Sequence, residues 1–208
     1  MGDSRAKHFS MIREFHLADF FTLANAASGV GSIFAAISFV ETGAMPQFFL
    51  AAALLPVALV FDILDGRIAR WRQRTSTLGR ELDSLSDVIS FGVAPAVLAF
   101  AAGMRSGWDR AVLIYFVACG VSRLARFNTT AETLSGGGDK VKYFEGTPIP
   151  TSVLLVGVLA LAAWRGRIGQ DLWLGEIALG PAPLHPLVIM FAVSGSLMIS
   201  KTIRIPKI

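Results

Sequence analysis

Residues 62–87 read DILDGRIARWRQRTSTLGRELDSLSD, and this stretch joins two long apolar segments of the chain. The stretch contains four aspartates, Asp62, Asp65, Asp83 and Asp87, and the interpretation of the fold starts from them. A charged side chain costs about 2.5–3.5 kcal/mol at the centre of a membrane helix on insertion scales, so acids beside apolar segments need a compensating partner. Hard divalent cations prefer carboxylate oxygens, and they are the partner that we expect here.

The spacing of these acids favours a shared site. Residues three or four apart lie on one face of a helix, so the two acids of each pair share a face. Gly66 and Ala69 lie four and seven residues after Asp62, and Gly79 lies four residues before Asp83. A bulky ligand can therefore lie against the backbone beside the acids. The alternative is a structural cluster of salt bridges with neighbouring arginines, which does not need these small residues.

The composition indicates a membrane protein. Of the 208 residues, 53% are hydrophobic and only 16% are charged, and the mean hydropathy is +0.59. The charges cluster, which leaves apolar runs long enough to cross a bilayer at about 20 residues each. We predict an all-α integral membrane protein with six transmembrane helices, preceded by an amphipathic juxtamembrane helix.

The predicted organisation is one membrane domain with an interfacial segment before it. Residues 1–19 are expected to form the amphipathic interfacial segment, and residues 20–208 the six-helix domain. The six spans are predicted at about 20–40, 47–69, 82–103, 109–127, 149–164 and 185–203. The segment between the second and third spans, about 70–81, is predicted to be a polar link.

Lysines and arginines indicate the orientation of the spans. If the N-terminus is cytoplasmic, most basic residues fall on the cytoplasmic side, as the positive-inside rule requires. Both aspartate pairs then lie at the cytoplasmic face, where nucleotides and small metabolites are found. The net charge of +4 comes from basic residues that flank apolar spans, so we expect anionic lipid headgroups and no nucleic acid as partners. The basic residues expected outside are Arg105, Arg110, Arg165 and Arg167.

The pattern of residues 62–87 resembles, position for position, the signature of the CDP-alcohol phosphatidyltransferases, membrane enzymes of phospholipid synthesis. The signature fixes eight residues over 26 positions, and this chain departs from it nowhere. The matching string is Asp62-x-x-Asp65-Gly66-x-x-Ala69-Arg70, then eight residues, then Gly79-x-x-x-Asp83-x-x-x-Asp87.

The resemblance implies roles for these residues. Asp87 would be the general base and would also lie near the metals. The implied metal ligands are Asp62, Asp65, Asp83 and Asp87. The implied contacts of the CDP-lipid are Asp62, Asp65, Gly66, Ala69, Arg70, Gly79 and Asp83. Four carboxylates on facing helices can hold two divalent ions, and all-oxygen ligation suits Mg²⁺ or Mn²⁺. The spacing alone does not separate the base from the ligands among the four aspartates.

Two further strings resemble the phosphatidylserine synthase branch of the family, namely residues 122–128 (SRLARFN) and 144–150 (FEGTPIP). This resemblance implies transfer of a phosphatidyl group from CDP-diacylglycerol to the hydroxyl of L-serine, with release of CMP. Arg123, Arg126 and Asn128 are then the expected serine contacts, because arginine pairs well with a carboxylate. The two arginines can instead be topology markers.

Three other functions stay open at this point. The same fold can use another acceptor, such as inositol phosphate or glycerol phosphate. A membrane prenyltransferase also uses aspartate-rich motifs, but it does not explain the small residues at these intervals. An ion-coupled transporter carries intramembrane acids, usually near the midplane. The family also tends to form homodimers, and the small residues Ala27, Gly31 and Ala35 permit close packing of the first span.

Overall fold

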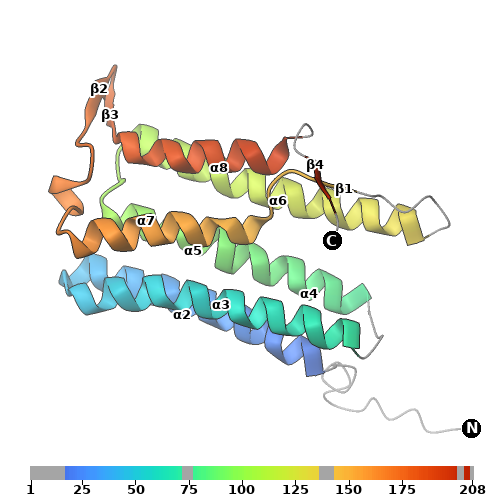
Figure 1. Ribbon diagram of the computed structural model, residues 1–208. Coiled ribbons are helices and arrows are strands. Elements are labelled where there is room, and N and C mark those ends of the chain that lie inside the picture. The colour runs from blue at the N-terminus through green and yellow to red at the C-terminus, as the bar shows by residue number, and fades with distance from the viewer. Residues whose placement is uncertain (1–16, 72–76, 136–142, 201–203, 207–208) are drawn as a thin grey trace, which may run out of the picture.

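The computed structural model describes residues 17–71, 77–135, 143–200 and 204–206 of the chain. Within these ranges the protein is mostly helical, and its helices lie side by side in one bundle (Figure 1). Four helices are long and apolar enough to cross a membrane, namely Ala18–Thr42, Met45–Ile68, Leu78–Ala102 and Gly107–Thr129.

The helical membrane architecture agrees with the prediction from the sequence. Two shorter apolar helices, Ile149–Trp164 and Pro186–Ile199, lie where the fifth and sixth spans are expected. Neither is as long as the first four, so the six-span count stays a prediction. The predicted amphipathic segment 1–19 lies almost wholly outside the described residues.

Helices α2 (Leu17–Thr42) and α3 (Met45–Trp71) form an antiparallel pair. Gly43 joins them with a φ of +70°, a conformation that costs glycine little. Small residues let the two helices approach closely, and a β-carbon on Gly31 would lie 3.3 Å from the Cδ1 of Leu54. The hydroxyl of Ser32 donates a hydrogen bond to the carbonyl oxygen of Ala51 at 2.8 Å. Part of the small-residue stripe of the first span therefore packs inside the chain.

Helix α4 (Thr77–Asp87), the π-helical turn η1 (Val88–Val93) and α5 (Ala94–Ala102) form one continuous helical segment. The π turn begins directly after Asp87 and buries Ser90, Phe91 and Gly92. Turns of this wider kind are rare, and they occur frequently at functional sites.

The second half of the chain covers the other side of the bundle with α6 (Gly107–Ser135), α7 (Ser152–Trp164) and α8 (Ile189–Ile199). A short 3₁₀ turn precedes each of the last two helices, η2 (Ile149–Thr151) and η4 (Pro186–Val188). Helices α6 and α8 pack through the rings of Phe116 and Phe191, whose centroids lie 5.2 Å apart in an edge-to-face arrangement. The hydroxyls of Tyr115 and Ser196 also lie 3.0 Å apart and share a hydrogen bond.

Two short strand pairs depart from the all-α expectation. Strand β1 (Tyr143–Glu145) pairs antiparallel with β4 (Arg204–Pro206), and β2 (Ile177–Leu179) pairs with β3 (Ala182–Leu184). The second pair is a hairpin that turns at Gly180 and is tied to α6 by a hydrogen bond from the indole N–H of Trp108 to the carbonyl oxygen of Leu179 at 2.8 Å. Another 3₁₀ turn, η3 (Gly169–Asp171), precedes this hairpin. The strands were missed because each has only three residues.

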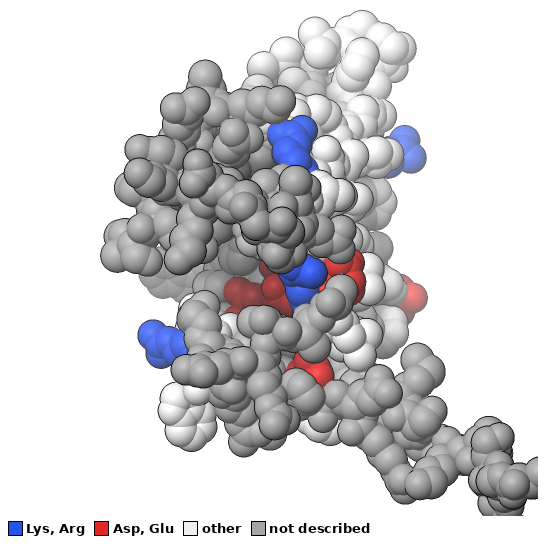
Figure 2. Space-filling model, turned by 90° about the vertical axis from the view of Figure 1, so that its right-hand side faces the viewer, with Lys and Arg blue, Asp and Glu red and all other residues white. Residues whose placement is uncertain are grey.

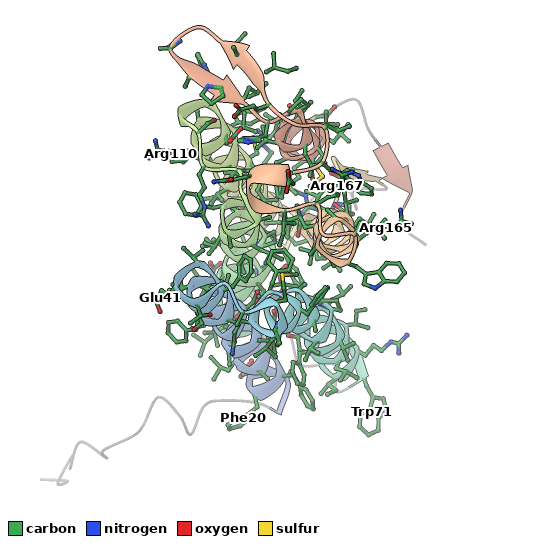
Figure 3. The ribbon with its side chains drawn as sticks, turned by 90° about the vertical axis from the view of Figure 1, so that its left-hand side faces the viewer. Phe20, Glu41, Trp71, Arg110, Arg165 and Arg167 are labelled. Atoms are coloured by element: carbon green, nitrogen blue, oxygen red, sulfur yellow. The ribbon has the colours of Figure 1, made fainter. Side chains whose placement is uncertain are left out.

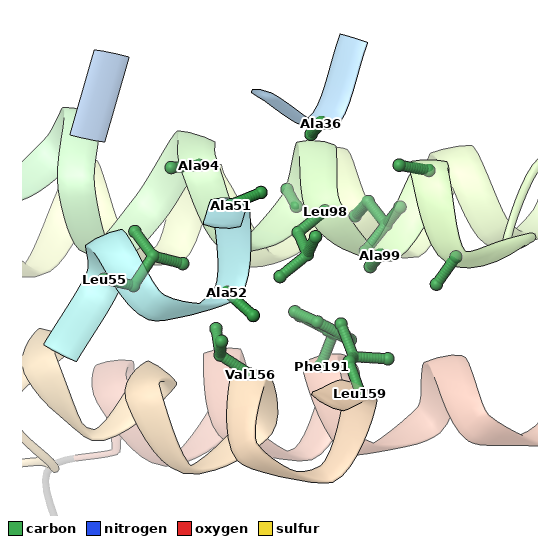
Figure 4. Close-up of a cluster of buried hydrophobic side chains, with 14 of the residues drawn as sticks. Ala36, Ala51, Ala52, Leu55, Ala94, Leu98, Ala99, Val156, Leu159 and Phe191 are labelled. Atoms are coloured by element: carbon green, nitrogen blue, oxygen red, sulfur yellow. The ribbon is translucent and has the colours of Figure 1, made fainter. Parts of the chain in front are cut away.

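The core is built largely from alanines and medium-sized apolar side chains where α2, α3, α5, α7 and α8 meet (Figure 4). Small residues compensate for their small contact area by letting neighbouring helices approach closely. Other large apolar side chains point outward, and Phe34, Ile114 and Leu154 are each well over half exposed. This distribution is typical of helices whose outer faces contact lipid. The labelled core residues are Ala36, Ala51, Ala52, Leu55, Ala94, Leu98, Ala99, Val156, Leu159 and Phe191.

The helices that carry the acids extend further than the spans predicted from the sequence. The link predicted at 70–81 is shorter, since α3 continues to Trp71 and α4 begins at Thr77. Its polar composition hid the helical period of Leu78, Leu82 and Leu85. Helix α6 likewise continues to Ser135, past the expected end at 127. Both aspartate pairs lie within helices, as the predicted spans 47–69 and 82–103 already had them.

Gly146 provides a test of how the segment before α7 is fixed. It has a φ of +74°, and a β-carbon there would collide with the backbone carbonyl of Met198, while the neighbouring Thr147 N–H bonds to the carbonyl oxygen of Leu197 at 3.2 Å. We expect Gly146→Ala to lower the Tm in detergent by about 4 °C or more. Gly157→Ala is the matched control, because its β-carbon would meet nothing within 4 Å. Equal Tm values for the two variants would contradict this account.

Candidate metal centre

Three of the four predicted acids converge at one end of the bundle. Asp62 on α3 and Asp83 and Asp87 on α4 each offer one carboxylate oxygen, and these three oxygens all lie within 4.8 Å of one another. Asp62 and Asp83 are half-buried, while Asp87 is buried, with 7% of its surface exposed. Carboxylates held this close repel one another unless a cation or protons lie between them.

The helix positions explain why these acids meet. Helices α3 and α4 lie next to each other at the same end of the molecule (Figure 1). Asp62 lies about two and a half turns before the end of α3, and Asp83 lies under two turns after the start of α4, at about 3.6 residues per turn. The two acids are therefore at similar depth. Asp87, one turn further along α4, lies on the same face as Asp83.

Asp65 is held differently from the other three. It is buried, with 6% of its surface exposed, and its Oδ2 accepts a hydrogen bond from the hydroxyl of Thr22 on α2 at 2.8 Å. Among the described residues it is not part of the three-carboxylate group. Its assignment as a metal ligand therefore stays a prediction.

Helix α2 also holds Asp87. The side-chain amide of Asn25 donates a hydrogen bond to Asp87 Oδ1 at 3.2 Å. The hydroxyl of Ser90, in the π turn, donates to the backbone carbonyl of Asn25 at 2.9 Å. The contact of Thr22 was not predicted, although two polar residues three apart in an apolar span are a sequence signal for bonds between membrane helices.

Several buried polar atoms near the acids have no hydrogen-bond partner within the described part of the chain. Buried polar groups are paired in the great majority of cases, so atoms of this kind at one place indicate a site for a polar or charged ligand. The free oxygen of Asp83 and the three converging carboxylates fit a hard divalent cation, which prefers oxygen ligands. The unpaired atoms are Asn25 Oδ1, Asp83 Oδ1, Arg80 Nε and Arg123 Nε.

The three residues predicted to bind the acceptor all lie on α6 and differ in their surroundings. Arg123 is half-buried and interacts electrostatically with Asp87. Arg126 is exposed. Asn128 uses both ends of its carboxamide on α4, where its NH₂ donates to Glu81 at 3.3 Å and its oxygen accepts from Ser84 at 3.2 Å. Figure 2 looks onto this end and shows acidic side chains gathered beside a basic one.

The small residues predicted to face a nucleotide lie on the same two helices as the acids. Gly66 on α3 and Gly79 on α4 are both half-buried. Ala69 and Arg70 belong to the last turns of α3, but their side chains lie outside the described residues. The contact of these four residues with a nucleotide stays a prediction.

A separate cavity of about 650 Å³ lies at the other end of the bundle, and none of the predicted site residues lines it. Beside it, the Nδ1 of His185 lies 2.6 Å from the Oδ2 of Asp109. Figure 3 looks onto that end, where Arg110, Arg165 and Arg167 lie. These arginines were predicted to lie outside, on the side opposite to the acids, and that sidedness stays a prediction. The residues that line the cavity include Phe39, Met45, Arg105, Glu176 and His185.

Comparison with known proteins places this site in a family. The model of the CDP-alcohol phosphatidyltransferase family matches residues 15–195. The chain is 43% identical over 203 residues to CDP-diacylglycerol–serine O-phosphatidyltransferase of Saccharomyces cerevisiae, which covers 96% of this chain and 74% of that protein. It is 41% identical over 143 residues to the Helicobacter pylori protein of the same name, which covers 68% of this chain and 55% of that protein.

An archaeal protein is similar as well. Archaetidylserine synthase of Methanothermobacter thermautotrophicus is 38% identical over 156 residues, which covers 73% of this chain and 60% of that protein. The chain thus spans less than two thirds of the bacterial and archaeal relatives named here, and about three quarters of the yeast one.

Removal of one converging carboxylate tests the metal centre. We expect Asp83→Asn to weaken Mn²⁺ binding at least tenfold, because a carboxylate ligand is replaced by a neutral amide. Electron paramagnetic resonance of free Mn²⁺ measures the affinity in detergent. Glu41→Gln is the matched control, since Glu41 is an exposed acid near the far end of α2 (Figure 3). The same affinity in both variants would show that Mn²⁺ binds elsewhere.

Proposed function

The chain belongs to the CDP-alcohol phosphatidyltransferase family, and from that premise we propose that it transfers the phosphatidyl group of CDP-diacylglycerol to the hydroxyl of L-serine. The products are phosphatidylserine and CMP. The names of the yeast and Helicobacter relatives support this acceptor. The observation that carries the proposal is the convergence of Asp62, Asp83 and Asp87, within a signature that matches the family at every position.

In the proposed reaction the serine oxygen attacks the phosphorus that carries the diacylglycerol. A new P–O bond forms to serine, and the P–O bond to CMP breaks, so that CMP leaves with the bonding electron pair. The proton of the serine hydroxyl passes to Asp87, which we assign as the general base. The buried position of Asp87 and its bond to Asn25 support this role, because a base must be held in a fixed orientation.

We assign the binding of two divalent ions, Mg²⁺ or Mn²⁺, to Asp62, Asp83 and Asp87, with Asp65 as the fourth ligand. When bound, such ions neutralise a diphosphate and stabilise charge on the attacking and leaving oxygens. Thr22 orients Asp65 by its hydrogen bond at 2.8 Å. The chemistry of the donor set supports this assignment, because carboxylate oxygens suit these two ions better than zinc.

The CDP part of the lipid substrate is assigned to the same two helices. Gly66, Ala69 and Gly79 leave the backbone accessible, so that a nucleotide can lie against it, and Arg70 would meet its phosphates. The acids Asp62, Asp65 and Asp83 border this surface. The half-buried positions of Gly66 and Gly79 support the assignment. The acyl chains would then extend between helices toward the bilayer.

The serine carboxylate is assigned to Arg123. A half-buried guanidinium whose Nε lacks a partner among the described residues, and which interacts with Asp87, suits a small anionic acceptor group near the base. Arg126, one turn further along α6 and exposed, is the second candidate. Asn128 is engaged with α4, so its contribution to serine binding would need those bonds to open.

For the whole protein we propose a multi-pass membrane enzyme with six spans and its active site at the cytoplasmic face. The distribution of basic residues along the sequence supports this orientation, because fewer of them are expected outside (Arg105, Arg110, Arg165 and Arg167) than on the cytoplasmic side. We also propose a homodimer. Gly31 packs against α3 within the chain. The dimer interface would therefore use a face of the protein that does not include Gly31.

An acceptor panel tests the proposed function. Purified protein is supplied with CDP-diacylglycerol and either serine, inositol phosphate or glycerol phosphate, and CMP release is measured. We expect CMP with serine only, its loss with a chelator and its recovery with Mn²⁺. Asp87→Asn serves as the inactive reference that still binds CDP-diacylglycerol. CMP release with a phosphorylated acceptor but not with serine would contradict the proposal.

A single substitution tests the acceptor site. We expect Arg123→Ala to raise the KM for serine at least tenfold, because a hydrogen bond to a charged group contributes about 1.5–3 kcal/mol. The KM for CDP-diacylglycerol should change less than threefold. Arg110→Ala removes an exposed arginine near the other end of the same helix and is the control. Equal changes in both KM values would assign Arg123 to the lipid substrate or to folding.

A further inference from the structure

We propose that Asn25 is the positioning residue for Asp87, and that α2 thereby takes part in the reaction without being part of the family signature. The inference rests on the proposed function, since it gives Asp87 the role of base. Asn25 lies 62 positions before Asp87 in the chain, and its Nδ2 reaches Asp87 Oδ1 at 3.2 Å. Asn25 has 0% of its surface exposed, so the bond lies in the interior of the bundle.

The chemistry of an amide suits this position. A neutral N–H donor fixes the orientation of a carboxylate without cancelling its charge. A lysine or arginine at the same place would compensate that charge. The proposed metal ions and the proton of the serine hydroxyl both need the negative charge of this carboxylate. With Oδ1 occupied by Asn25, the rotation of the Asp87 carboxylate is restricted, and its second oxygen has a defined direction.

The backbone of Asn25 is also fixed, from the π turn. Ser90 Oγ donates to the carbonyl oxygen of Asn25 at 2.9 Å, and Ser90 has 0% of its surface exposed. The two segments touch here because Gly29 has no side chain; a β-carbon on Gly29 would collide with Ser90. Asn25 is therefore bonded twice to the segment around Asp87. Its side-chain amide binds the carboxylate of Asp87, and its backbone carbonyl accepts a bond from Ser90 in the π turn that follows.

The remaining polar atom of Asn25 points to a ligand. Its Oδ1 is buried and has no hydrogen-bond partner among the described residues. A buried asparagine with a purely structural role usually has both ends of its carboxamide satisfied. An N–H or O–H donor of a bound molecule is the partner that fits, and the ammonium and hydroxyl groups of serine are donors of this kind.

Ser32 shows what a purely structural bond looks like on the same helix. It lies seven residues after Asn25, has 0% of its surface exposed, and bonds to the backbone carbonyl of Ala51 on α3. Ser32→Ala thus removes a buried bond between α2 and α3 without altering the acids. It is the matched control for a loss of packing or stability.

Three substitutions separate positioning from packing. Asn25→Ala removes the amide and leaves a cavity, Asn25→Leu removes the amide but keeps the approximate volume, and Asn25→Gln keeps an amide on a longer side chain. We expect the kcat for CMP release to fall about 100-fold in the Ala and Leu variants, because a misplaced catalytic group costs on this order. The Gln variant should recover part of the loss. Binding of CDP-diacylglycerol should stay within threefold of wild type, and Ser32→Ala should keep its kcat.

Two results would overturn the role of Asn25. One is a kcat restored by leucine, which would assign the effect to packing. The other is a parallel loss of kcat and CDP-diacylglycerol binding, which would assign it to the lipid site or to folding. Wild-type protein that releases no CMP with any acceptor would instead contradict the proposed function. Failure of the role of Asn25 and failure of the proposed function are therefore distinguishable. If one of the three Asn25 variants does not fold, the other two still test the role of Asn25.

Discussion

The structure depends on how carboxylates are held among apolar helices. Charged groups are expensive to bury, and repulsion within the group of Asp62, Asp83 and Asp87 adds to that cost. The first helix of the bundle reduces the freedom of two acids with neutral donors, from Thr22 to Asp65 and from Asn25 to Asp87. These bonds orient the acids without neutralising their charge. Carboxylates that stay charged and close together repel one another, and a bound cation removes this repulsion. The arrangement therefore suits a protein that binds cations.

This constraint also explains the shape of the helical segment that contains Asp87. The π turn begins at the next residue and brings Ser90 to the backbone of Asn25. A regular α-helix has fewer residues per turn, so it would rotate each following side chain by a larger angle and change which of them face α2. The glycine at position 29 allows the contact. Local helix geometry, close packing and the orientation of one carboxylate are thus parts of a single arrangement.

Much of this site was predictable from the sequence. The acids recur at helical spacing, so a shared face for each pair followed from periodicity, and a common site for all four was predicted with the family signature; three of them, Asp62, Asp83 and Asp87, do converge. The separate position of Asp65 did not, because periodicity gives the face of a helix but not the partner that a neighbouring helix supplies. Thr22 is 43 positions from Asp65, and no local pattern connects them. The start of α4 was missed because charged residues concealed its apolar period.

The most direct test is the position of bound Mn²⁺ in an experimental structure of the active enzyme. Anomalous diffraction from crystals grown with Mn²⁺ locates the ion independently of the protein atoms. The account predicts strong peaks within coordination distance of the carboxylates of Asp62, Asp83 and Asp87. Peaks elsewhere, or side chains of these three residues that point apart in a preparation that releases CMP, would contradict it.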